Sequence, residues 1–196
     1  MEILLTLGVF ALVSSITPGP NNLMLMSSGA TYGVRSTLPH IFGVCLGFTW
    51  MVFLVGVGVM QVFDAFPLSY TILKWVSIGY LLYLALKIAR SSRPSQVDTS
   101  VSRPFSFFQA ASFQWVNPKA WTMALSAISV YAPTKDINAV VLVALVFGLV
   151  NLPCIFAWTL LGQKLQVFLT SAPKLKMFNY AMATLLALSL YPVLFT

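Results

Sequence analysis

The stretch Thr17-Pro18-Gly19-Pro20-Asn21-Asn22 lies in the middle of a long apolar run, Ile3–Gly33. Two prolines that flank a glycine prevent a continuous α-helix there, because each proline removes a backbone donor and its ring displaces a carbonyl group. Two asparagines follow immediately. The sequence therefore predicts a helix that unwinds at the two prolines and begins again near Asn21.

A second interruption, Trp115-Val116-Asn117-Pro118-Lys119-Ala120-Trp121, lies in the middle of the apolar run Phe105–Ala132. It places an amide, Asn117, and a cation, Lys119, beside Pro118. Both apolar runs exceed the ~20 residues that a straight helix needs to cross a bilayer, as expected for helices that lose rise at an unwound centre. A single proline ordinarily marks a kink that helps packing. Two Asn-Pro-type interruptions at equivalent depths instead favour a binding site.

Composition requires a chain that is embedded in a membrane. The chain is 59% hydrophobic and only 8% charged, and its mean hydropathy is +0.89, whereas soluble domains carry about 25% charged residues. Helix is expected throughout, because lipid cannot satisfy exposed backbone groups. Six apolar runs are long enough to span: Ile3–Gly33, Pro39–Met60, Pro67–Ala89, Phe105–Ala132, Ile137–Leu161 and Leu175–Phe195. The predicted fold class is an all-α polytopic membrane protein, with residues 1–196 forming one transmembrane domain.

The order of the runs predicts two inverted repeats. A polar stretch, Arg90–Arg103, separates the first three runs from the last three. Since three runs separate the two interruptions, the halves cross the membrane in opposite orientations, which is the arrangement of an inverted repeat with broken helices 1 and 4. We expect repeats at about 1–89 and 105–196, joined by a cytoplasmic linker at 90–104. The fifth run carries a further predicted break at Asn151-Leu152-Pro153.

Basic residues predict the orientation of the chain. If the N-terminus lies outside the cytoplasm, the outer loops carry only Lys135. The inner side then collects Arg35, Lys87, Arg90, Arg93, Arg103, Lys164, Lys174 and Lys176. Cytoplasmic loops are enriched in Lys and Arg, so both termini are expected outside the cytoplasm. Orientation accounts for the net charge of +7, and no nucleic-acid partner is expected.

Together the two interruptions offer both groups that an amino acid needs. The half-helix that begins near Asn21 presents free N–H groups and a positive dipole end, which suit a carboxylate. Freed carbonyls and side-chain amides can accept hydrogen bonds from an ammonium group. Lys119 is the candidate for exchanging a proton with the substrate, because no Asp or Glu lies at the midplane. The candidate substrate-binding residues are Pro18, Gly19, Pro20, Asn21, Asn22, Gln114, Asn117, Pro118, Lys119 and Asn151. We expect no catalytic residue, metal or cofactor.

At these residues the sequence resembles the LysE/RhtB family of amino-acid exporters, and within it the type that exports cysteine and O-acetylserine. The resemblance covers nearly the whole chain. Its specific matches are the stretch 17–22 and Phe113-Gln114-Trp115-Val116-Asn117-Pro118-Lys119, with others at Gly33-Val34-Arg35, Leu73-Lys74-Trp75 and Tyr80-Leu81. It implies six helices, efflux from the cytoplasm across a bacterial inner membrane, and coupling to the proton motive force. Members export amino acids from lysine to cysteine, so the substrate stays open.

Two features leave alternatives open. Cys45 and Cys154, in the second and fifth runs, are compatible with a membrane dithiol oxidoreductase that relays electrons, although such thiols need a reactive setting beside the breaks and Cys45 has no proline or cation nearby. A structural or signalling membrane protein would not need polar residues at two breaks. Gly43 and Gly47 permit close helix approach, either within the chain or between two copies in a homodimer.

Overall fold

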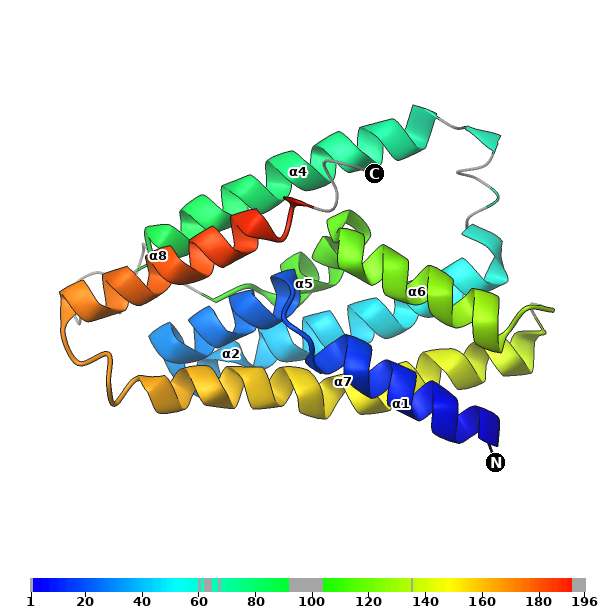
Figure 1. Ribbon diagram of the computed structural model, residues 1–196, viewed down its shortest axis with the longest axis horizontal. Coiled ribbons are helices and arrows are strands. Elements are labelled where there is room, and N and C mark those ends of the chain that lie inside the picture. Colours follow the sequence, from blue (N-terminus) through cyan, green and yellow to red (C-terminus); the bar gives the residue numbers. More distant parts are fainter. Residues whose placement is uncertain are drawn as a thin grey trace.

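The computed structural model describes residues 2–59, 61, 65–66, 68–91, 104–134 and 136–191, and all regular structure among them is helical. This confirms the predicted all-α fold class (Figure 1). The helices are α1 (Glu2–Ile16), α2 (Pro20–Leu54), the π-helical turn η1 (Val55–Val59), α4 (Leu68–Ala89), α5 (Phe107–Phe113), the 3₁₀ turn η2 (Gln114–Val116), α6 (Pro118–Tyr131), α7 (Ile137–Leu165) and α8 (Ala172–Leu188).

Within the part of the chain that the structure describes, three helical segments are long and apolar enough to cross a membrane. They are Pro20–Val59, Leu68–Ala89 and Ile137–Leu165, and α1 is a shorter apolar helix. Many large apolar side chains on these helices face outward, among them Ile3, Leu5, Trp50 and Leu149. A surface of this kind suits contact with lipid rather than water.

The predicted break in the first run is confirmed. α1 ends at Ile16 and α2 begins at Pro20, with Gly19 extended between them (φ −173°, ψ 176°). A proline at the start of a helix is well tolerated, because its missing N–H has no partner there in any case. The break therefore lies where the sequence placed it.

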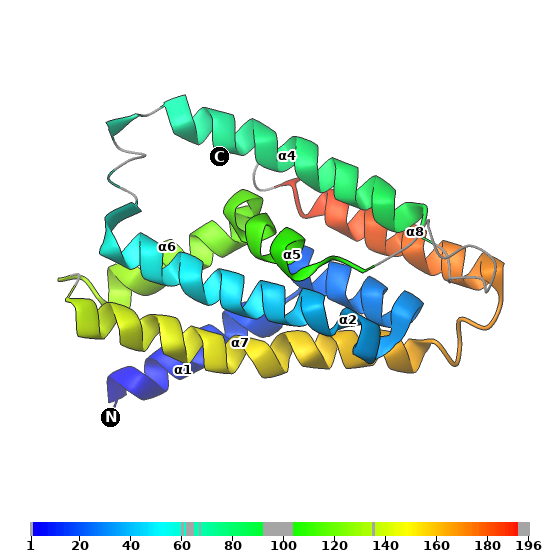
Figure 2. The same cartoon turned by 180° about the vertical axis from the view of Figure 1, so that it is seen from behind.

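The turn after this first half of α2 is tighter than expected. The sequence predicted a connection between Gly33 and Pro39, but the helix reverses at Gly33 alone, and Pro39 lies inside the returning helix. Gly33 has φ 80°, a left-handed conformation that costs glycine little. Both halves lie along α7: Gly29 packs against Thr159, while Cys45 donates to the Gly148 carbonyl. Residues 20–32 and 34–54 thus form a helical hairpin (Figures 1 and 2).

The fourth run is also interrupted as predicted. α5 passes into the 3₁₀ turn η2, and Asn117 leaves the helical region (φ −96°, ψ 107°) before α6 begins at Pro118. α5 itself starts with a capping box, in which Ser106 and Gln109 satisfy each other's backbone amides. The two broken helices run in opposite directions through the molecule (Figure 1).

The predicted break at Asn151-Leu152-Pro153 is wrong. α7 continues from Ile137 to Leu165 with Pro153 inside it. One proline removes a single amide donor, and the helix packs against α2 on both sides of that point, at Gly148 and at Thr159. Packing along the whole length therefore holds α7 together through one missing hydrogen bond.

Glycines set the closest helix contacts. A Cβ at Gly29 or Gly162 would collide with the facing backbone of the α2–α7 pair, so these helices approach as small-residue faces do in membranes. The Gly43 and Gly47 face packs against α5, where a Cβ on Gly47 would lie 2.6 Å from Ala111 Cα. Of the two alternatives for this face, the structure shows the contact within the chain.

Segment ends gather at two opposite ends of the molecule. The turn at Gly33, the end of α4, the end of α7 and the start of α8 lie together at one end, and the N-terminus, the end of α6 and the start of α7 lie at the other (Figures 1 and 2). The first group of segments carries Arg35, Lys87, Arg90, Lys164, Lys174 and Lys176. Lys135, Arg93, Arg103 and nearly all of the predicted linker lie outside the described residues.

Candidate functional site

The carbonyl end of α1 is closed by side chains from other segments. The last carbonyl groups of a helix have no partner within it. Here Asn22 Nδ2 donates to the carbonyl oxygens of Ser15 and Thr17, both at 2.8 Å. Trp158 of α7 donates from Nε1 to the Ile16 carbonyl at 3.0 Å. The break is therefore stabilised by contacts that only the folded chain supplies.

Lys119 closes the rest of that end from the opposite broken helix. Its Nζ donates to the Thr17 carbonyl at 2.8 Å, to the Thr17 hydroxyl at 2.9 Å and to the Pro18 carbonyl at 3.3 Å. A cation at the negative end of a helix dipole is favourable. A Cβ on Gly19 would lie 2.6 Å from Lys119 Cδ, so the glycine gives this side chain its room.

A pair of amides joins the two breaks directly. Asn21 Nδ2 donates to Gln114 Oε1 at 2.9 Å, and Gln114 Nε2 donates back to Asn21 Oδ1 at 3.2 Å. Gln114 Nε2 also donates to the Ala110 carbonyl at 2.9 Å. Since Gln114 is fully buried, both of its polar atoms depend on these partners.

The two half-helices that start at the breaks are capped differently. Asn117 is the N-cap of α6, where its side-chain oxygen accepts from the Lys119 amide at 3.2 Å, with Pro118 at the first helical position. This is the usual role of an Asn-Pro pair. α2 starts after Gly19 and has no side-chain cap. Its first amides are therefore left to other partners.

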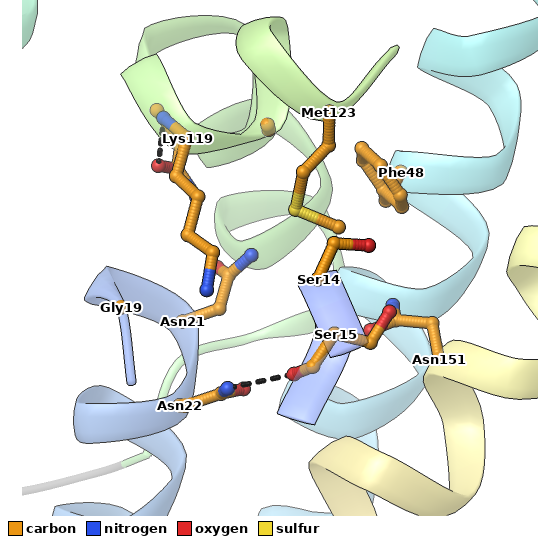
Figure 3. A pocket seen from close by; sticks show the side chains of 11 residues that line it. Ser14, Ser15, Gly19, Asn21, Asn22, Phe48, Lys119, Met123 and Asn151 are labelled. Atoms are coloured by element: carbon orange, nitrogen blue, oxygen red, sulfur yellow. Dashed lines mark hydrogen bonds between the residues drawn. The ribbon is translucent and has the colours of Figure 1, made fainter. Parts of the chain in front are cut away.

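A small polar cavity lies between the two breaks (Figure 3). Its lining residues are Ser14, Ser15, Gly19, Asn21, Asn22, Phe48, Asn117, Lys119, Ala120, Met123 and Asn151. Its volume of about 30 Å³ leaves room for no more than a few water molecules. An amino acid therefore enters only after a side chain or a helix has moved. The Ser15 hydroxyl is buried here with no hydrogen-bond partner among the described residues.

Six of the ten candidate residues meet at this cavity, and four do not. Those that line it are Gly19, Asn21, Asn22, Asn117, Lys119 and Asn151. Gln114 lies behind Asn21, Pro18 is exposed, and Pro20 and Pro118 begin the half-helices. Sequence reasoning missed the other five lining residues, Ser14, Ser15, Phe48, Ala120 and Met123. The two serines directly before the break were the available signal.

The cysteines lie away from this cavity. Cys45 and Cys154 are buried and unbridged, and neither lines the cavity between the breaks. Cys45 is occupied by a contact from its Sγ to the Gly148 carbonyl at 3.4 Å. The arrangement gives the electron-relay alternative no support.

Comparison with known proteins identifies the family of this chain. Residues 12–189 match the family model described as a LysE type translocator. The chain belongs to the LysE family. Cysteine/O-acetylserine efflux proteins from Escherichia coli (strain K12), Shigella flexneri serotype 5b (strain 8401) and Shigella sonnei (strain Ss046) are each 30% identical to this LysE-family chain over 162 residues, covering 80% of either protein. No solved structure matches it. Both interruptions fall inside the matched region, and this LysE translocator is a multi-pass membrane protein.

Proposed function

We propose that this protein is a secondary transporter that exports small neutral amino acids or their derivatives, of the cysteine or O-acetylserine kind, from the cytoplasm. The observation that carries the proposal is the polar cavity between the breaks of two oppositely directed helices. Binding at broken helices near the midplane is how many secondary transporters hold their substrates. The efflux relatives of this family support the same direction and substrate class.

The cavity and the unwound segment beside it together offer a partner for each pole of an amino acid. The uncapped start of α2, at Asn21 and Asn22, suits the carboxylate, because free amides and the dipole both favour an anion. The carbonyls of Thr17 and Pro18 suit the ammonium group. Phe48, Ala120 and Met123 supply an apolar wall, and the lining includes no Asp or Glu. Small neutral side chains therefore fit better than cationic ones.

The proposed architecture has six spans in two inverted repeats. α1 with residues 20–32 corresponds to α5 with α6, residues 34–59 correspond to α7, and α4 corresponds to α8. The opposite directions of the two broken helices support this pairing (Figure 1). The end that carries the basic residues faces the cytoplasm of a bacterial inner membrane under the positive-inside rule. Both termini then lie outside.

Coupling to protons is the proposed source of energy. Lys119 is the one residue with a readily ionised side chain among those that line the cavity. An ionisable group inside a membrane marks an ion pathway by default. In this scheme Lys119 takes a proton from outside and releases it inside as the substrate binds. One proton enters for each amino acid that leaves.

The test is to overproduce the protein in a bacterium and to measure amino-acid pools inside and outside the cells. One small neutral amino acid or derivative should fall inside and rise outside. Asn21→Ala, at matched abundance in the membrane, should weaken substrate affinity by about 5- to 150-fold, because a buried polar partner costs roughly 1–3 kcal/mol. Unchanged pools despite abundant inserted protein would rule the proposal out.

A further inference from the structure

The contacts of Lys119 are those that a free amino group needs. An ammonium group carries three N–H donors and no acceptor. Lys119 Nζ meets three oxygen acceptors, the carbonyls of Thr17 and Pro18 and the hydroxyl of Thr17, all within 3.3 Å. The α-ammonium of an amino acid has the same charge and the same three donors. The acceptors cannot distinguish one group from the other by chemistry alone.

We propose that the Lys119 ammonium stands in for the α-ammonium group of the substrate in the empty carrier, and that substrate binds by displacing it. This inference rests on the proposed export function and assigns the ammonium subsite within it. Figure 3 shows Lys119 reaching from α6 toward Gly19 and Asn21 on the other broken helix. Its partners belong to the unwound segment rather than to α6 itself.

Space at the site supports displacement rather than joint occupancy. With Lys119 in place, the cavity has only about 30 Å³, room for a few water molecules at most. Two like charges at the same three acceptors would also repel each other strongly. Lys119 is half-buried, and its flexible stem allows it to withdraw without movement of α6. The substrate thus replaces the cation that already fills its place.

The occupation of the ammonium subsite by Lys119 has a consequence for the transport cycle. With Lys119 bound, the empty site has the same charge as the loaded site, and the carbonyls of Thr17 and Pro18 keep their donors. Without it, the empty carrier would have to change conformation while those carbonyls lack a protein donor, which is costly wherever the closing protein keeps water from them. Lys119 therefore speeds the return of the empty carrier. It is not needed for one substrate molecule to exchange for another.

The experiment compares exchange with net efflux in proteoliposomes loaded with the amino acid identified in the pool measurement. Lys119→Met should still exchange substrate across the membrane. If Lys119 fills the subsite roughly 90–99% of the time, the substrate concentration that gives half-maximal exchange should fall by about 10- to 100-fold in this variant. Net efflux should fall by roughly tenfold or more, since return now leaves carbonyls unpaired. Lys74→Met, on α4 and away from the cavity, should change neither rate.

Gly19→Ala provides a second variant that leaves Lys119 in the chain. The added Cβ would lie 2.6 Å from Lys119 Cδ, the flexible part of that side chain, and so should push the ammonium off its acceptors. It should shift both measurements in the same direction as Lys119→Met.

Loss of exchange in an inserted, folded Lys119→Met protein would overturn the inference, because the substrate would then need Lys119 itself. The inference would also be overturned if Lys119→Met matched the parent protein in both the half-saturating concentration for exchange and the rate of net efflux. In either case the proposed function stands if the parent protein exports. Failure of the parent protein to move any amino acid contradicts the proposed function instead.

Discussion

At the scale of single residues, the side chains at the breaks have two different structural roles: some cap their own helix, and others close the end of another helix. Asn117 closes the start of its own helix. Asn22, Trp158 and Lys119 close the end of a helix to which none of them belongs. Changes at the first kind of residue should affect local helix stability, and changes at the second kind should also affect how the two broken helices are held together.

Asn117 allows a test of a side chain that caps its own helix. Asn117→Ala removes an N-cap and should lower the free energy of unfolding by about 0.5–2 kcal/mol, whereas Asn117→Ser should cost much less because serine also caps helices well. The midpoint of thermal unfolding in detergent measures both. Equal loss in the two variants would show that the side chain matters for a reason other than its cap to the Lys119 amide.

The reciprocal amide pair between Asn21 and Gln114 allows a test of a contact that holds the two broken helices together. Asn21→Ala leaves the buried Gln114 Oε1 without its donor, although Nε2 keeps the Ala110 carbonyl, and should cost about 1–3 kcal/mol of stability. Adding Gln114→Met removes the orphaned amide at similar volume, so the double variant should lose about 0.5–3 kcal/mol less than the sum of the single losses. Strictly additive unfolding midpoints would mean that the two amides do not interact.

At the scale of elements, the hairpin of α2 packs along nearly the whole of α7. The contact is closest where Gly29 and Gly162 face backbone atoms of the opposite helix. Helices in membranes associate through such small-residue contacts, since lipid gives no hydrophobic driving force between them. The pair should therefore be sensitive to a single added methyl group.

Gly162→Ala places a Cβ against the Met26 carbonyl. Because a backbone atom cannot move aside cheaply, overpacking should cost about 1–3 kcal/mol. Gly79→Ala on α4, where nothing lies within 4 Å of the added Cβ, should be neutral or stabilising by up to about 1 kcal/mol. Thermal unfolding of both variants, measured side by side, checks this, and equal midpoints would show that α2 and α7 are less tightly packed than described.

Local chemistry made the breaks predictable, and the rest depended on tertiary contacts. Two prolines around Gly19 cannot stay helical in any setting, so the first break was visible in the sequence. The break predicted at Pro153 was wrong, because one lost hydrogen bond is tolerated when the helix is packed along its length. The sequence predicts the end of the first run at Gly33. It does not predict that the turn is only one residue long, because that depends on the positive φ of Gly33. No local pattern could show that Lys119 closes α1 from another helix.

At the scale of the whole molecule, basic residues gather at one end and predict the orientation. Thr134→Cys, in the α6–α7 turn, should be labelled by an impermeant thiol reagent in intact cells. Ser171→Cys, in the α7–α8 turn, should be labelled only after the cells are opened. Both positions are exposed, so accessibility within the protein does not explain a difference. The reverse pattern would invert the topology and with it the direction of transport.

A chain without cysteines provides the background for that labelling and tests the alternative function. Cys45→Ser with Cys154→Ser should retain export within about twofold, because both thiols are buried packing groups outside the cavity. Amino-acid efflux from cells that carry the double variant measures this. Complete loss of function at normal abundance would revive the electron-relay reading.

The left-handed turn at Gly33 has a mechanical consequence. Residues 20–32 form a short rod that is joined to the rest of the chain by one glycine at one end and by the extended Thr17–Gly19 segment at the other. At Gly29 and Gly162 this rod meets the facing helix backbone to backbone, and Gln166 Nε2 donates to the Gly29 carbonyl at 3.1 Å. We expect any rocking of residues 20–32 to turn them as one unit about these two joints, against a continuous α7. Such rocking would open the cavity to one side of the membrane while the rest of the bundle keeps its shape.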